Sequence, residues 1–330
     1  IWPGSVVAKT AEDGIRIVDS MRAAGADFVK VYSRLLPETF AAIATRAREI
    51  GIPIAGHVPS LVRPAEAARA GIRTVEHLQQ ALQGCSSREE ELLADYSVAA
   101  RSPGGWDSAS AVSRRQTPLY LASHDPARCR ALGGEFARAQ TWMVPTFTVL
   151  RSISRLDDTT LAADERLQYV PGFLKTGWNP KNDFRFRMVT PAGWAVRRQV
   201  YARQLEIARL LRDGGARFLA GTDLANPYIF AGSSLHDELA LFVSVGFSPL
   251  EALQAATIEP ARFLGATDSL GTVAAGQLAD LVLLEADPLA NIENVRRVAV
   301  VVANGRVFDQ EARAKILADA KQRASAGPRQ

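Results

Sequence analysis

One short stretch decides the fold prediction, ADFVKVYS at residues 26–33. Its aromatic and β-branched residues predict a buried strand. Lys30 lies in the middle of this strand, and a buried ammonium is unfavourable unless it is paired, neutralised or chemically modified. Alternation predicts that Phe28, Lys30 and Tyr32 share one face, while Val29 and Val31 pack on the other. A lysine at this position therefore indicates a functional role.

The residues around this stretch alternate between helix and strand patterns. Helix patterns occupy residues 10–25, 37–51 and 63–71, and each ends at a glycine suited to a helix C-terminus. Strand patterns occupy residues 52–60 and 72–80 in addition to the opening stretch. This order predicts parallel strands joined by right-handed helical crossovers.

Two polar excursions, at residues 81–140 and 151–194, interrupt the alternation. Between them, TWMVPTFTVL at 141–150 predicts a further strand. A long amphipathic helix is predicted over 195–215, and it is followed by another strand pattern at 216–226.

The last third of the chain carries clear helix and turn signals. SLHD at 234–237 has the Ser-x-x-Asp spacing of a capping box, and SPLE at 248–251 places Ser, Pro and Glu at the N-cap, N1 and N3 positions. Strand patterns follow, with the Asn-Gly pair at 304–305 predicting a hairpin turn. Residues 311–330 predict a polar helix that fades into a disordered end.

Four apolar runs carry a residue that can bind a metal at or near their C-terminal end, namely Lys30, His57, His77 and Asp223. In a parallel α/β barrel or open sheet the carboxyl ends of the strands form the active-site face, so these residues are expected to converge. Neutral imidazole and carboxylate are ordinary zinc ligands. A lysine whose amine takes up carbon dioxide becomes a carbamate with two oxygens, which would turn a buried cation into a ligand.

Each of these residues, taken singly, also has a purely structural explanation. A histidine at a strand end is commonly a packed residue, an aspartate after Gly-Thr is commonly a helix cap, and a lysine can reach solvent or pair with a carboxylate. Their shared position at successive strands favours a site. Tyr32 is expected to point into the same cavity. His236, in the first turn of a helix after the Asp223 strand, faces either that cavity or the surface, and His124 is expected at the surface.

The composition is that of an ordinary globular protein. The 330 residues are 47% hydrophobic and 22% charged, which is enough for one large domain or for one large and one small domain. The net charge of +4 is spread along the chain and predicts no nucleic-acid partner. No apolar run reaches the length of a membrane span. Cys85 and Cys129 either form one bridge or remain free thiols, and localisation and oligomeric state, a homo-oligomer included, stay open.

The chain resembles the amidohydrolase superfamily, and within it the imidazolonepropionase-like and prolidase-like branch. The resemblance is carried by the motifs VKVY, GHV, TVEH and GTD in that order, and by the tail from ATIEPARFLG to VANGRVF. It implies a TIM-like (β/α)8 barrel of which strands four to eight are present, followed by the C-terminal half of a small β-sandwich. The implied domains are the barrel at 1–265, the sandwich portion at 266–310 and a polar tail at 311–330.

The resemblance also implies a mechanism and a role for each residue. Lys30 would be the carboxylated lysine that bridges two metals, His57 and His77 would be the ligands after the fifth and sixth strands, and Asp223 would bind metal and carry a proton. The implied reaction is hydrolysis of an amide or peptide-like C–N bond by metal-activated water, with zinc as the expected divalent metal. For a prolidase-like substrate, Tyr32 and Arg34 are the candidates that bind the substrate carboxylate.

The sequence departs from the family pattern at its beginning. The family places a His-x-His pair on the first strand, whereas no histidine precedes His57 here. We therefore expect this sequence to be the C-terminal portion of a longer protein, with metal occupancy in this portion left open.

Three alternatives to this prediction differ in class. A cyclic-amide hydrolase or a deaminase could use the same scaffold, although a deaminase would not need Lys30. A non-catalytic amidohydrolase-like scaffold has no need of all four ligand types. A Rossmann or flavodoxin-like binding domain is disfavoured because no glycine-rich phosphate loop follows an early strand.

Overall fold

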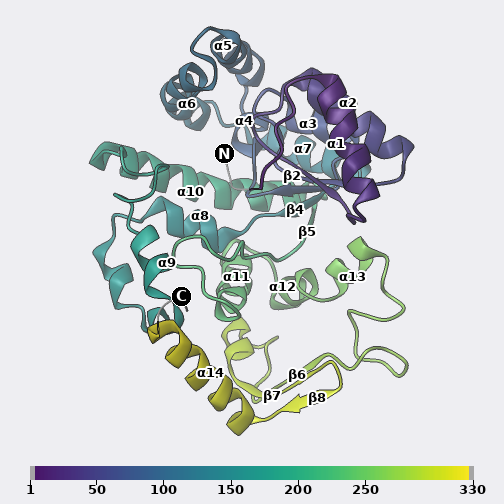
Figure 1. Cartoon of the computed structure of the whole chain (residues 1–330), viewed down its shortest axis with the longest axis vertical. Helices are drawn as coiled ribbons and strands as arrows, with labels where there is room; N and C mark the ends of the chain where they lie inside the picture. The colour runs from purple at the N-terminus through teal and green to yellow at the C-terminus, as the bar shows by residue number, and fades with distance from the viewer. Residues whose placement is uncertain (1–3, 327–330) are drawn as a thin grey trace. The chain divides into compact units, whose positions relative to one another are not determined.

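The computed structural model describes residues 4–326 of the chain (Figure 1). The chain divides into two compact units. Unit 1 comprises Ile1–Pro145 and Ala202–Phe218, and unit 2 comprises Thr146–Tyr201 and Leu219–Gln330. The expected boundary at residue 266, between a barrel and a sandwich portion, stays a prediction.

Among the described residues, unit 1 contains five parallel strands in chain order. Their bounds are β1 Val29–Val31, β2 Ile54–Gly56, β3 Thr74–Glu76, β4 Trp142–Val144 and β5 Arg217–Phe218. β1 pairs with β2, and β3, β4 and β5 form a second sheet. An isolated parallel bridge between Ile54 and Ile72 links the two sheets. Together with the helices between its strands, unit 1 is a mixed α/β fold, as the alternating pattern predicts, whereas a closed barrel stays a prediction.

The helices expected before and between the first strands are present. Their bounds are α1 Ala11–Ala23, α2 Pro37–Glu49 and α3 Pro64–Ala70. α2 buries Phe40, Ile43 and Ala47 at helical spacing. α1 approaches α2 at Gly14, where an added Cβ would lie 2.8 Å from Ile43 Cγ1. This close approach explains why a glycine is used inside α1.

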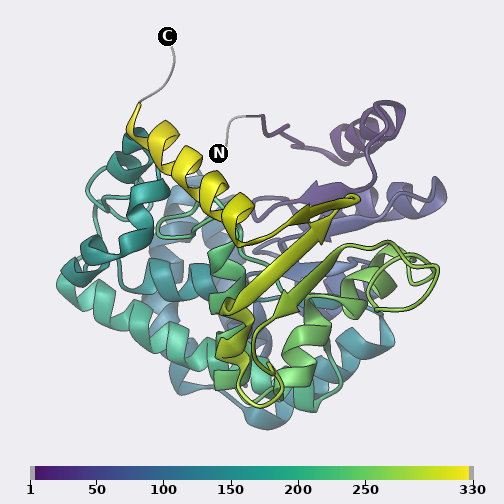
Figure 2. The same ribbon diagram turned by 90° about the horizontal axis from the view of Figure 1, so that it is seen from below.

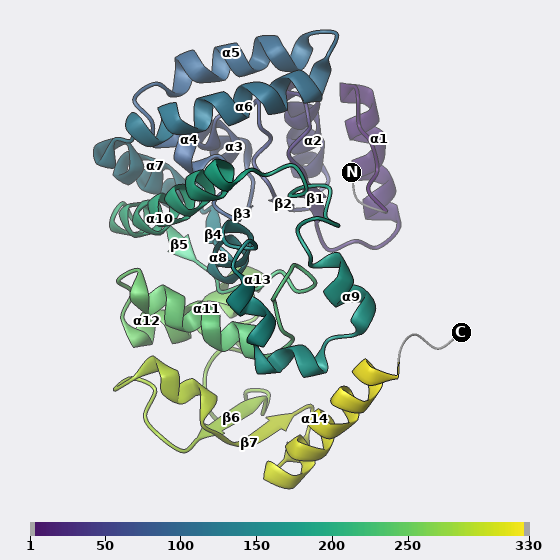
Figure 3. The ribbon, with the colours of Figure 1, turned by 90° about the vertical axis from the view of Figure 1, so that its left-hand side faces the viewer.

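The first excursion is helical and forms a closed loop. Its helices are α4 Ala81–Gly84, α5 Glu89–Arg101, α6 Gly105–Ala122 and α7 Pro126–Arg138. α5 and α6 lie side by side (Figure 3). Cys85 and Cys129 form a disulfide with their Cα atoms 4.6 Å apart, which decides between the two alternatives for the cysteines.

The expectation that His124 lies at the surface is wrong. Its side chain is only 4% exposed, with Nε2 3.6 Å from Glu206 Oε1 and Nδ1 3.9 Å from Cys129 Sγ. Burial and the nearby Arg203 lower the pKa of His124. The sequence around His124 is polar, but the disulfide holds this segment against the rest of unit 1.

Unit 2 contains most of the remaining helices. Their bounds are α8 Phe147–Ser154, η1 Thr159–Ala163, η2 Glu165–Tyr169, α9 Gly172–Gly177, α11 Ser233–Ser244, α12 Pro249–Ala255, α13 Ile258–Leu264, η3 Ile292–Arg296 and α14 Gln310–Ser325. The long helix α10, Pro191–Asp213, contributes residues to both units. None of the helices in the described part of the chain is long and apolar enough to span a membrane.

The predicted strand at 141–150 is only partly correct. β4 ends at Val144, Thr146 adopts a left-handed conformation with φ of 48°, and α8 begins at Phe147. The apolar run continues across this turn because Phe147, Val149 and Leu150 are buried as helical residues. A short apolar run cannot by itself distinguish strand from helix.

The C-terminal part of unit 2 contains an antiparallel sheet of β6 Leu281–Leu284, β7 Val298–Ala303 and β8 Arg306–Phe308 (Figure 2). Asn304 and Gly305 both have positive φ and connect β7 to β8, as predicted from the Asn-Gly pair. α14 follows this hairpin. The predicted disordered end falls largely on residues 327–330, which lie outside the described residues.

The two predicted capping boxes have opposite outcomes. Ser248 and Glu251 form the predicted capping box at the start of α12. At α11 the prediction is wrong, since Gly232 is the N-cap and no side chain caps the helix. Ser234 Oγ instead accepts from the Phe230 N–H at 2.8 Å. Asp237, the fourth residue of SLHD, forms ion pairs with three arginines from other segments, Arg151, Arg166 and Arg296.

Candidate metal centre

Three of the predicted ligands lie in unit 1 on neighbouring parallel strands. Lys30 lies in β1 opposite Ala55 of β2. His57 directly follows β2, and His77 directly follows β3. The carboxyl ends of these strands therefore bring the three residues to one edge, as predicted from their positions in the sequence.

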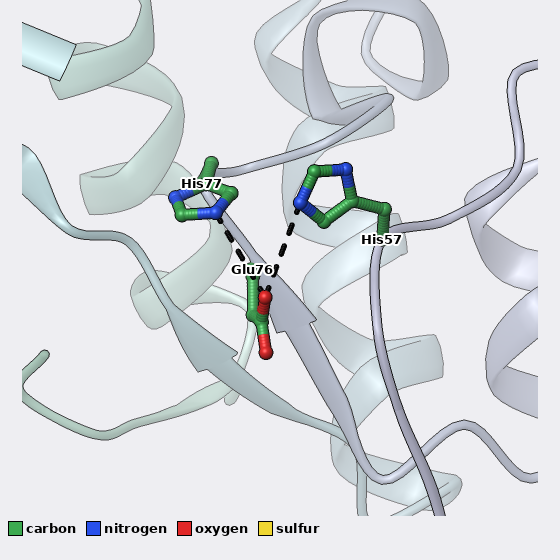
Figure 4. Close-up of side chains that lie close together, drawn as sticks. All are labelled: His57, Glu76 and His77. Atoms are coloured by element: carbon green, nitrogen blue, oxygen red, sulfur yellow. Dashed lines mark ion pairs between the residues drawn. The ribbon is translucent and has the colours of Figure 1, made fainter. Parts of the chain in front are cut away.

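The two histidines converge on a carboxylate, Glu76 (Figure 4). Glu76 Oε2 lies 3.9 Å from His57 Nε2 and 3.8 Å from His77 Nε2. One donor atom from each of the three residues lies within 4.8 Å of the others. Separations of 3.8 to 3.9 Å are too long for hydrogen bonds. Two imidazoles and one carboxylate form a donor set typical of zinc sites.

Glu76 is not among the metal ligands predicted from the sequence. Neighbouring residues of a strand normally point to opposite faces, so Glu76 and His77 would not be expected to share a site. The alternation ends at this point, since His77 and Leu78 have φ of 56° and 51°. These left-handed residues turn the chain directly after β3, so that the side chains of Glu76 and His77 approach one another. The sequence signal that was available is the glutamate within the motif TVEH.

His57 is held as a neutral imidazole. Its side chain is 6% exposed, and burial, reinforced by His77 and Lys30, lowers the pKa of His57 to about 3. Ser33 Oγ lies 2.9 Å from Nδ1, and the ring stacks on Tyr32 with centroids 4.0 Å apart. When Nδ1 carries the proton and donates to Ser33, the lone pair of Nε2 faces Glu76. This is the tautomer that a metal ligand needs.

Lys30 is not buried, contrary to the expectation from its strand. Its side chain is 46% exposed, and Nζ lies 2.5 Å from Glu76 Oε2. Val29 and Val31 are buried as predicted, whereas Phe28 is exposed. Because Lys30 has both solvent and a carboxylate partner, burial gives no reason for carbamate formation. That modification stays a proposal based on the resemblance.

The donor set fits a divalent cation in three respects. Zinc distances place two tetrahedral ligand atoms about 3.4 Å apart, so the nitrogen–oxygen separations would have to shorten by only about half an ångström. Glu76 Oε2 is buried and, among residues 4–326, accepts no hydrogen bond of regular geometry. The positive charge that lies next to Glu76 Oε2 is the Lys30 ammonium. The group therefore already attracts a cation.

The structure places the two predicted substrate-binding residues of unit 1 differently. The Tyr32 ring stacks on the imidazole of His57, so Tyr32 contacts a residue of the candidate centre. Arg34 is exposed, and its charge acts on Tyr96, where it partly offsets the rise in pKa that burial causes. Both assignments to a substrate stay predictions.

Asp223 and His236 belong to unit 2. Asp223 lies in a loop after β5 with φ of 50°, and its Oδ2 accepts from Asn226 Nδ2 at 2.7 Å. His236 lies in the first turn of α11 and is half-buried. Burial and Arg296 lower its pKa. The convergence of Asp223 with the unit 1 residues stays a prediction.

Comparison with known proteins gives one family and several related structures. The sequence model of the Amidohydrolase family matches residues 35–308. A bottromycin amidohydrolase structure is 26% identical with a TM-score of 0.69, and the match covers 98% of this chain and 66% of that one. No curated protein matches the chain.

Two further structures share the fold. A Xaa-Pro dipeptidase with bound methionine is 18% identical with a TM-score of 0.58, over 93% of this chain and 62% of that one. A Bifidobacterium longum structure described as a putative prolidase is 20% identical with a TM-score of 0.57, over 98% of this chain and 68% of that one. The chain thus spans about two thirds of the length of these proteins. Since the family match covers most of its length, the chain belongs to the amidohydrolase family.

Proposed function

We propose that this chain is the metal-binding portion of a hydrolase that cleaves an amide or peptide-like C–N bond. The observation that carries the proposal is the convergence of His57, Glu76 and His77 at the carboxyl ends of β2 and β3. This convergence occurs in a member of the amidohydrolase family. A packed core histidine would not require a second histidine and a carboxylate at this spacing.

The metal would be held by the Nε2 atoms of His57 and His77, by Lys30 as a carbamate, and by Asp223. Ser33 supports the required tautomer of His57 through Nδ1. Glu76 would supply the carboxylate oxygen of this donor set in unit 1, beside the two imidazoles. Zinc is the metal that this donor set favours, and the second metal site of the family would need the His-x-His pair of the first barrel strand.

The proposed reaction is the metal-assisted hydrolysis that the family resemblance implies. When bound, a divalent cation activates water at neutral pH and polarises the scissile carbonyl. Asp223 accepts the proton of the attacking water and passes it to the leaving amine. Tyr32 and Arg34 are proposed to bind a substrate carboxylate, and His236 a further substrate group.

We also infer that β1 to β5 correspond to strands four to eight of a (β/α)8 barrel. Their parallel pairing in chain order, with the ligands after successive strands, supports this correspondence. The antiparallel sheet of β6, β7 and β8 would then be part of the small β-sandwich.

The proposed substrates are X-Pro dipeptides and N-acyl amino acids. The solved structures include a Xaa-Pro dipeptidase and a bottromycin amidohydrolase, which supports an amide or peptide-like substrate.

The test combines metal analysis with activity. We expect purified protein to bind zinc stoichiometrically and to hydrolyse members of a panel of X-Pro dipeptides and N-acyl amino acids. Lys30→Ala should abolish hydrolysis, whereas Lys9→Ala, at an exposed lysine of unit 1, should not. Full activity of Lys30→Ala would contradict the mechanism. A chain that binds no zinc would favour the non-catalytic scaffold.

A further inference from the structure

Asp223 is held by a neighbour in its own loop. Asn226 Nδ2 donates to Asp223 Oδ2 at 2.7 Å and to the Asp223 carbonyl oxygen at 3.2 Å. The backbone N–H of Asn226 also donates to this carbonyl oxygen, at 3.4 Å. One amide group therefore fixes both the backbone turn and one oxygen of the carboxylate.

The second excursion determines which way this amide faces. Arg185 Nη1 donates to Asn226 Oδ1 at 3.1 Å. A guanidinium can only donate, so Oδ1 must face Arg185 and Nδ2 must face Asp223. The opposite orientation would point the amide oxygen at the carboxylate and the amide hydrogens at the guanidinium. Arg185 thereby selects the orientation in which Asn226 supports Asp223.

Arg185 is itself locked by a bidentate ion pair. Its Nε lies 3.0 Å from Asp183 Oδ1, and its Nη2 lies 2.7 Å from Asp183 Oδ2. Its guanidinium carbon lies 4.9 Å from the centre of the buried Phe186 ring. Asp183 balances the charge of Arg185, so the arginine can orient Asn226 without adding a net positive charge beside Asp223.

Other contacts from the same region secure the rest of the loop. Trp178 Nε1 donates to the Ala225 carbonyl oxygen at 3.4 Å, and Ser152 Oγ donates to the Pro227 carbonyl oxygen at 2.5 Å. Ala225 has a φ of 85°, a conformation that is unfavourable for residues other than glycine. Such conformations persist where the surrounding structure holds them, and they cluster at functional sites.

We propose that Asn226 and Arg185 are positioning residues for Asp223, so that the excursion at 151–194 helps to orient the carboxylate that carries the proton. This inference rests on the proposed role of Asp223 in hydrolysis and metal binding. Groups that orient a ligand or a base typically change metal affinity or activity 10–100-fold when removed, because small misplacements are amplified in the transition state.

The experiment compares Asn226→Ala, Arg185→Ala, the double variant and Asp223→Ala in the full chain. Asn226→Ala should lower kcat roughly 10–100-fold and zinc affinity roughly 10-fold, with KM changed less than about twofold. Arg185→Ala should have a smaller effect of the same kind, and Arg185→Lys should restore part of the loss. Arg187→Ala, at an exposed arginine of the same excursion, should match the wild type. Thermal unfolding of each variant shows whether unit 2 remains folded.

The decisive comparison is the double variant. Because Arg185 acts through Asn226, the double variant should be no worse than Asn226→Ala alone. If the losses of activity in Asn226→Ala and Arg185→Ala add up in the double variant, the positioning role is overturned. It is also overturned if Asn226→Ala keeps the wild-type kcat and zinc affinity while Asp223→Ala is inactive. Both outcomes leave the proposed function intact. An Asp223→Ala variant with wild-type activity and zinc affinity would instead overturn the proposed function, and the positioning role with it. The zinc measurements need no substrate.

Discussion

Glu76 in unit 1 and Glu238 in unit 2 are both carboxylates withdrawn from solvent, but their neighbours differ in kind. Glu238 is fully buried in α11, and its oxygens accept from the backbone N–H groups of Phe147 and Thr148, each at 2.8 Å, and from Thr148 Oγ1 at 3.0 Å. Glu76 is 19% exposed and faces Lys30 and two imidazole nitrogens.

The difference separates a structural carboxylate from a functional one. The hydrogen-bond donors around Glu238 are the first backbone N–H groups of α8. The N-cap residue of α8 makes no side-chain hydrogen bond to them, so Glu238 accepts the hydrogen bonds that a capping side chain would otherwise accept. The imidazole nitrogens near Glu76 lie 3.8 to 3.9 Å from its Oε2, too far for a hydrogen bond. A carboxylate that already holds the Lys30 ammonium, beside the neutral imidazole of His57, can also hold a metal cation.

Removal of Glu238 is expected to give the largest effect on stability. Glu238→Ala leaves two backbone N–H groups and a cavity inside unit 2, so the free energy of unfolding should fall by about 3 kcal/mol. Glu76→Ala should change it by less than about 1 kcal/mol, since the group is partly solvated. Denaturant unfolding of both variants measures the contrast, and equal losses would erase the distinction between the two carboxylates.

The pH dependence of stability provides a second contrast. Burial outweighs the three hydrogen bonds and raises the pKa of Glu238 from 4.5 to about 7. Between these two pKa values Glu238 therefore keeps a proton in the folded protein that it releases in the unfolded chain. The stability that this proton provides is fully present below about pH 4.5 and is lost as the pH rises through about 7. The decline amounts to at most about 3 kcal/mol.

Glu238→Gln provides the control for this prediction because the amide does not titrate. Unfolding free energies measured at pH 5 and pH 8 should fall more for the wild type than for Glu238→Gln. An identical decline in the two proteins would show that another group causes it.

Metal affinity should depend on Glu76 and not on Glu238. Glu76→Gln keeps the side-chain size but removes the negative charge beside His57 and His77, so zinc affinity should fall roughly 10–100-fold. Glu238→Gln should leave it within about twofold. Equilibrium dialysis against zinc tests both, and unchanged affinity in Glu76→Gln would remove Glu76 from the centre.

The ion pair between Lys30 and Glu76 should have the smallest effect. Lys30 is half-exposed, so a double-mutant cycle of Lys30→Met and Glu76→Gln should give a coupling energy below about 1 kcal/mol that decreases with salt. A larger coupling that is insensitive to salt would indicate that the pair is a structural element, like Glu238.

Much of the fold could be predicted because its signals are local. The strands around Lys30, His57 and His77 were indicated by short apolar runs, and the helices between them by a 3.6-residue period that ends at glycine. The position of ligands at strand ends follows from the geometry of any parallel sheet. Local chemistry also determined the Asn304–Gly305 hairpin.

The remaining features have no side-chain signal in the local sequence, and some of them depend on contacts between residues distant in sequence. The exposure of Lys30 depends on how β1 packs, and the approach of Glu76 to His77 depends on a left-handed turn that no side-chain pattern marks. The expected capping role in SLHD failed because Asp237 pairs with Arg166 and Arg296. Arg166 and Arg296 lie 71 and 59 residues away from Asp237 in the sequence.

The bridge between Cys85 and Cys129 has a consequence for how this family member can vary. The chain leaves and re-enters the neighbourhood of β3 through one narrow neck, where the Asp125 N–H also donates to the Cys85 carbonyl oxygen at 2.8 Å. The free-energy cost of lengthening a closed loop grows only slowly with its length. Residues 86–128 can therefore gain or lose helical turns while the ends of the segment, and with them the strands that carry His77, keep their separation.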